Sequence, residues 1–146
     1  MNRFARWLTP ALAVAGIGVT AYLTWVHYDI DALVCGVGDC LEVQASEYSE
    51  LLGIPVAILG LGMYVAVLVL SLARGRHPGH ATTITTALFV ITLIGTLYSA
   101  YLTWIEVYEI EAICQWCVAS AIITTLIFVV ETARLWRGDE GSPAVP

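Results

Sequence analysis

Four long apolar stretches constrain this chain more than any other feature of its sequence. They cover roughly residues 8–27, 54–73, 82–105 and 113–136. Each is close to the ~20 residues that a helix needs to cross a hydrocarbon core of about 30 Å. Lipid offers the backbone no hydrogen-bond partner, so spanning segments must be helices or a closed barrel. The sequence therefore predicts an all-α integral membrane protein with a bundle of four transmembrane helices.

Composition and charge support this prediction and give an orientation. The chain is 59% hydrophobic and only 12% charged, whereas soluble domains carry about 25% charged residues. All basic residues fall at the N-terminus, in the middle loop or after the last stretch, three places that four spans put on one side of a membrane. By the positive-inside rule we predict that this side is cytoplasmic. The basic residues are Arg3, Arg6, Arg74, Arg76, Arg134 and Arg137.

The two other loops hold nine of the twelve acidic residues, so we predict an acidic extracytoplasmic face. The net charge of −6 follows from this face, and nothing in the pattern indicates nucleic-acid binding.

A repeat relates the two halves of the chain. The pentapeptide Ala-Tyr-Leu-Thr-Trp occurs at residues 21–25 and again at 100–104, and each copy is followed ten residues later by a cysteine. The first apolar stretch therefore belongs to the mature fold, although residues 1–15 resemble a signal peptide. The aromatic residues around both copies predict an interfacial belt, with His27 as an interfacial polar residue. They are Tyr22, Trp25, Tyr28, Tyr101, Trp104 and Tyr108.

The first outer loop, about residues 28–53, contains Cys35 and Cys40 around a glycine-containing turn that lets the sulfurs approach each other. Apolar residues then recur at helical spacing from Leu41 to Leu52. We predict a short interfacial helix here, ended by Gly53 and capping the bundle mouth. Pro55 is expected in the first turn of the second span.

Cys114 and Cys117 form a Cys-x-x-Cys pair at the expected start of the fourth span. A spacing of three places both side chains on one helix face. All four cysteines fall on the side that we predict to be extracytoplasmic, where disulfides persist. Four cysteines allow three pairings, and the sequence does not choose between them.

Three interpretations of the cysteines compete. Two structural disulfides would make the chain a small membrane scaffold without turnover, but a Cys-x-x-Cys bridge closes too small a loop to stabilise much. A zinc site is chemically possible, although an oxidising compartment disfavours it. In a dithiol relay, the loop pair meets a soluble partner, the helix pair meets a lipid-soluble oxidant, and thiol–disulfide exchange connects them. We favour the relay, whose direction depends on redox potentials.

The order of motifs resembles the vitamin K epoxide reductase family, in its bacterial disulfide-forming branch. A loop cysteine pair is followed by Ser46, by Gly-Ile-Pro at 53–55, by Gly60-x-x-x-Tyr64 and by the Cys-x-x-Cys of the fourth span. The resemblance covers roughly residues 8–136. The disulfide bond formation protein B type has similar chemistry, but its Cys-x-x-Cys precedes the separated pair.

This resemblance implies roles for the cysteines. A reduced thioredoxin-fold (DsbA-like) partner, a separate protein, would attack the Cys35–Cys40 disulfide, at Cys40. Cys35 would exchange with Cys114, and Cys117 would pass two electrons to a membrane quinone of the menaquinone, ubiquinone or vitamin K type. Ser46 would help to close or polarise the quinone pocket, and no metal is implied.

The resemblance also implies a bacterial-type plasma membrane location and a membrane domain at 1–138. The polar, proline-containing composition of residues 139–146 predicts a short disordered tail, which the arginine positions place on the cytoplasmic side. Val56 and Ala121 stand where the vertebrate enzymes have an asparagine and a tyrosine linked to substrate contact. We therefore expect plain quinone reduction with disulfide formation as its output, and not epoxide reduction.

Overall fold

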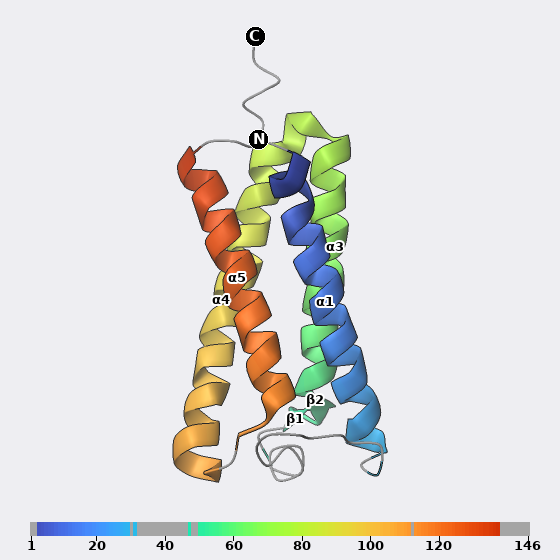
Figure 1. Cartoon of the computed structure of the whole chain (residues 1–146), viewed down its shortest axis with the longest axis vertical. Coiled ribbons are helices and arrows are strands. Elements are labelled where there is room, and N and C mark those ends of the chain that lie inside the picture. The colour runs from blue at the N-terminus through green and yellow to red at the C-terminus, as the bar shows by residue number, and fades with distance from the viewer. Residues whose placement is uncertain (1–2, 30, 32–46, 48–49, 112, 138–146) are drawn as a thin grey trace.

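The computed structural model describes residues 3–29, 31, 47, 50–111 and 113–137. Four long helices run up and down alternately and form one bundle (Figure 1). All four are long and apolar enough to cross a membrane, which confirms the predicted fold class. Their bounds lie close to those expected from the apolar stretches: α1 (Arg3–Tyr28), α3 (Val56–Arg76), α4 (Ala81–Ile105) and α5 (Gln115–Arg137).

The helices form a ring in which α1 and α4 each pack against both α3 and α5. One end of the bundle holds the start of α1, the end of α5 and the short helix η3 (Pro78–His80) between α3 and α4 (Figure 1). We call it the arginine end, because Arg74, Arg134 and Arg137 lie there. The opposite end holds Cys114 and Cys117, and we call it the cysteine end.

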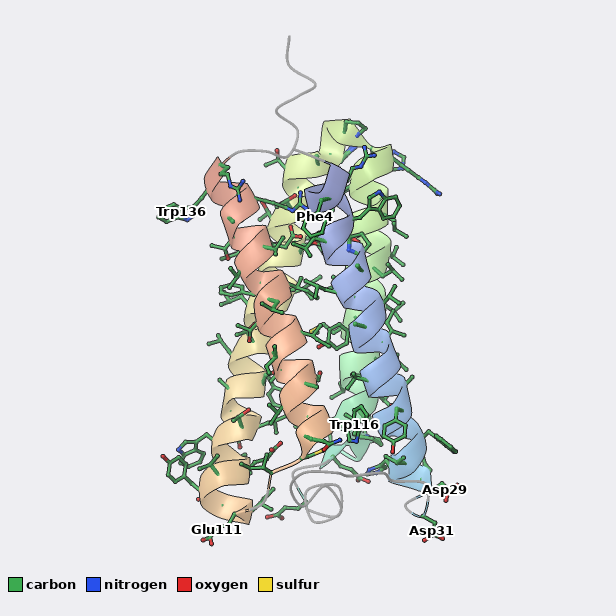
Figure 2. The ribbon with its side chains drawn as sticks, in the orientation of Figure 1. Phe4, Asp29, Asp31, Glu111, Trp116 and Trp136 are labelled. Atoms are coloured by element: carbon green, nitrogen blue, oxygen red, sulfur yellow. The ribbon has the colours of Figure 1, made fainter. Side chains whose placement is uncertain are left out.

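The charges separate along the bundle axis as the sequence predicts. Asp29, Asp31 and Glu111 lie at the cysteine end, opposite the arginines (Figure 2). Glu131, in the last turns of α5, is an exception because it lies among the arginines. The cytoplasmic location of the arginine end remains a prediction.

The segment before α3 corrects one expectation. Strand β1 (Glu50–Leu51) pairs antiparallel with β2 (Ile54–Pro55) where the sequence predicted the end of an interfacial helix. Leu52 and Gly53 have φ of 55° and 83°, and consecutive positive φ values make a two-residue hairpin turn that no α-helix contains. Pro55 consequently precedes α3 instead of lying in its first turn. Residues 41–46, the start of the predicted helix, lie outside the described residues.

The middle of the bundle is held by Tyr64 of α3. Its ring is fully buried and its hydroxyl lies 2.6 Å from Thr124 Oγ1 and 2.8 Å from the Ser120 carbonyl oxygen, both on α5. The ring packs directly against Gly16 of α1, where a Cβ atom would overlap it. Tyr64 thus joins three helices through one side chain, and Gly16 makes room for it.

The arginine end is held by the fully buried Glu131 of α5. Arg74 of α3 donates to Glu131 Oε2 at 2.6 Å and to the Thr85 hydroxyl of α4 at 2.9 Å. Thr9 of α1 donates to Glu131 Oε1 at 2.6 Å. Buried charges are tolerated when they are paired and hydrogen-bonded, and here the pairing connects all four helices.

Gly16→Ala is expected to destabilise the bundle, because the added methyl group meets the Tyr64 ring. Overpacking of this kind costs about 1–3 kcal/mol. The thermal unfolding midpoint in detergent should fall. Gly18→Ala is the matched control, since nothing lies within 4 Å of a Cβ atom at Gly18 on the same helix. Equal midpoints for the two variants would contradict the close packing of Tyr64 on α1.

Glu131→Leu is expected to lower the free energy of unfolding by about 3–5 kcal/mol, because it leaves the buried Arg74 without its counter-ion. The double variant Glu131→Leu/Arg74→Leu should recover part of this loss, since it removes the Arg74 charge as well, although the buried Arg134, which also pairs with Glu131, remains. Chemical unfolding in detergent would measure both. A double variant less stable than the single one would contradict this account.

Candidate functional site

Cys114 and Cys117 lie at the start of α5, as the sequence predicts. The backbone N–H of Val118 donates to the Cys114 carbonyl oxygen at 3.0 Å, so Cys114 occupies the residue just before the first helical turn. Cys117 lies within that turn, and a hydrogen bond links the two cysteine side chains. The pair is therefore close enough for a reaction between its two sulfur atoms.

The pair lies in a hydrophobic cluster at the cysteine end. Cys114 is fully buried and contacts the cluster formed by Leu23 and Val26 of α1, whereas Cys117 is half-buried. Trp116, between the cysteines, packs against Tyr22 of α1 with ring centroids 5.0 Å apart. Figure 2 shows Trp116 at this end of the bundle. These contacts fix the start of α5 against α1.

Cys117 also lines a cavity of about 490 Å³ that opens among the helices. The walls are mostly apolar and include Leu51 of the hairpin, Leu59 and Met63 of α3, and Ile91 and Ile94 of α4. Small-molecule sites have volumes of about 300–1,000 Å³ and mostly apolar linings, so this cavity has the size and character of a ligand site. We call this cavity the chamber, and Cys117 is the cysteine among its described lining residues.

A few polar groups line the same cavity. Tyr64, Ser120 and Thr124 form one hydrogen-bonded group in the wall. His27 of α1 lies within 3.1 Å of Glu50 Oε1 and joins the end of α1 to strand β1. The sequence predicted only an interfacial polar residue at His27, so its place in the cavity wall comes from the fold.

Glu106 is the site residue that sequence reasoning missed. It begins the π-helical segment η4 (Glu106–Ile110), which follows α4, and it is only 5% exposed. Its Oε2 accepts a hydrogen bond of 3.3 Å from the backbone N–H of Cys114. Glu111, with φ of 57°, then turns the chain towards α5. The sequence offers no signal for this, because Glu106 looks like the neighbouring outer-loop acids until the chain reverses.

The other predicted site residues fall into two groups. Cys35, Cys40 and Ser46 lie outside the described residues, so their roles stay predictions. Val56 and Ala121 both line the cavity. The two positions at which the resemblance predicts a departure from the vertebrate pattern are therefore part of the cavity wall.

Most of the predicted interfacial aromatic residues are exposed at the cysteine end, where a belt requires them. Trp25 is 57% exposed and its repeat counterpart Trp104 is 51% exposed. Tyr22 differs from its counterpart Tyr101, because Tyr22 packs on Trp116 while Tyr101 is half exposed. The repeat is thus equivalent in sequence but not in its contacts with the cysteine pair.

The fold and the site together define a membrane-spanning helical bundle with a cysteine pair beside an apolar chamber. The sequence model of the vitamin K epoxide reductase family matches residues 7–132, and the chain belongs to this family of membrane oxidoreductases. Over 116 residues it is 32% identical to the thiol-disulfide oxidoreductase LTO1 of Arabidopsis thaliana. The match covers 75% of this chain but 31% of LTO1, so the chain spans less than a third of that relative.

Proposed function

We propose that this protein is a quinone-dependent thiol–disulfide oxidoreductase that reoxidises a disulfide-forming partner. The observation that carries the proposal is the position of Cys117, which is hydrogen-bonded to Cys114 and also lines the apolar cavity. One cysteine of the pair thus adjoins the chamber, and the other is buried behind it. Membership of a family that is linked to quinones supports the same conclusion.

The residues of the chamber fit a quinone. Its apolar walls suit a lipid-soluble ring, and a few polar side chains also line it. Val56 and Ala121 add only apolar surface at the positions where the vertebrate enzymes carry polar side chains. This favours plain quinone reduction over epoxide reduction.

A bound quinone would accept two electrons and two protons. Cys114 and Cys117 supply them by forming a disulfide, since oxidation of two thiols to one disulfide releases that number of each. The cluster of Leu23, Val26 and Trp116 around the pair excludes water and holds the sulfurs in place.

In this scheme, Cys35 and Cys40 carry electrons from a separate thioredoxin-fold partner of the DsbA type to Cys114. Ser46 contributes to the quinone pocket. The cysteine end faces the extracytoplasmic side, and both termini are cytoplasmic, in accordance with the arginine positions.

Cys117→Ala is expected to abolish quinone reduction by a reduced thioredoxin-fold dithiol, because it removes the sulfur next to the chamber. Quinol formation would be followed by absorbance in detergent. The matched control Val118→Ala changes the next residue of α5 and leaves all four cysteines intact. Turnover by Cys117→Ala would contradict its position next to the quinone. A wild-type protein inactive with menaquinone, ubiquinone and vitamin K would favour the scaffold with structural disulfides.

Ala121→Phe is expected to lower quinone turnover, because the ring fills part of the chamber. We expect a loss on the order of tenfold or more, the factor that corresponds to about 1.4 kcal/mol of lost binding. Ile122→Phe is the matched control, since Ile122 is 55% exposed on the outside of the same helix. KM and kcat for the quinone would be compared between the variants. Equal losses in both would place the substrate outside this chamber.

A further inference from the structure

Glu106, the first residue of η4, is a buried carboxylic acid. Within η4 it is only 5% exposed, while Glu109, three residues later, lies on the exposed side of the segment. None of the three ion pairs among the described residues includes Glu106. Burying a carboxylate without a cationic partner is costly, so its presence needs a reason.

Among the described residues, the recorded polar interactions of Glu106 are with the cysteine pair. Its carboxylate accepts the hydrogen bond from the Cys114 backbone N–H and interacts electrostatically with both Cys114 and Cys117. It also lines the chamber that Cys117 lines, and among the described lining residues it is the single carboxylic acid. Glu106 is therefore in contact with Cys114 and, like Cys117, forms part of the chamber wall.

A purely structural role would not require an acid. The hydrogen bond to Cys114 needs an acceptor oxygen, which a glutamine amide supplies equally well without the cost of a buried charge. What a carboxylate adds is the ability to take up a proton and release it again. Buried carboxylates near reacting groups act as general acids and bases in many enzymes.

Three other ionisable side chains besides Cys117 are among the described residues that line the chamber, and they belong to α1, α3 and α4. His27 of α1 interacts with Glu50, and the Tyr64 hydroxyl of α3 interacts with Ser120 and Thr124. Tyr98 of α4 lines the chamber as well. Of these described side chains, Glu106 is the one with a recorded hydrogen bond to Cys114, the residue just before α5.

We infer that Glu106 is the proton carrier between the cysteine pair and the quinone, an inference that rests on the proposed function. Two S–H bonds break, one S–S bond forms, and both electrons pass to the quinone. Each thiol proton moves in turn to the Glu106 carboxylate and from there to the quinone, so that one O–H bond forms on each of the two quinone oxygens. Glu106 ends the cycle in the protonation state in which it began.

The test uses Glu106→Gln, with Glu109→Gln as the matched control on the exposed side of the same segment. Quinone turnover by Glu106→Gln should fall at least about 100-fold, the range of general acid–base contributions, while Glu109→Gln keeps wild-type turnover. Glu106→Asp keeps the acid at shorter reach and should retain more activity than the glutamine variant. Wild-type turnover in Glu106→Gln, or equal losses in Gln and Asp, would overturn the inference.

A second measurement separates proton transfer from a structural effect and needs no quinone. The rate of Cys117 alkylation in the fully reduced protein would be recorded against pH. A carboxylate beside the thiol opposes a second negative charge, so Glu106→Gln should shift this profile to lower pH although turnover falls. An unchanged profile would overturn the inference, even if the wild type shows no quinone turnover and the proposed function itself fails.

Discussion

Every polar group in the interior of this bundle has to find its partner within the protein, because the surrounding lipid offers none. At the arginine end this requirement is met by Glu131, which pairs with Arg74 and accepts a hydrogen bond from Thr9. In the middle it is met by the Tyr64 hydroxyl and two hydroxyl groups of α5. These two polar layers connect all four helices and fix their rotation about their own axes. The positions of the helices at the cysteine end follow from the packing in these two layers.

The cysteine end differs because its polar groups are arranged around a space. Packing of α1 against the start of α5 buries Cys114, while Cys117 remains at the wall of the chamber. The π-helical segment after α4 turns Glu106 inward, against the Cys114 backbone. π-Helical segments are frequent at functional sites. The polar layers at the arginine end and in the middle thus join the same helices that carry the cysteine pair, Glu106 and the chamber at the other end.

The two copies of the repeat make different contacts with the site. α1 and α4 carry the same pentapeptide and present Trp25 and Trp104 outward. Yet Tyr22 of α1 packs on Trp116 of the cysteine pair, and α4 instead continues into η4 and supplies Glu106. The two equivalent helices therefore contact the same site through residues at non-equivalent positions, because the ring of helices places α1 and α4 on opposite flanks of α5.

The sequence by itself determined the four spans, the separation of charges along the bundle and the helix start at Cys114, because hydropathy, arginine positions and residue spacing are local properties. It failed at residues 50–53, where positive φ angles make a hairpin that side-chain periodicity does not reveal. Only the tertiary structure decided that Glu106 is buried, that Val56 and Ala121 share a wall, and that Cys117 adjoins the chamber. These are contacts between segments far apart in the chain, and they exist only once the helices have packed.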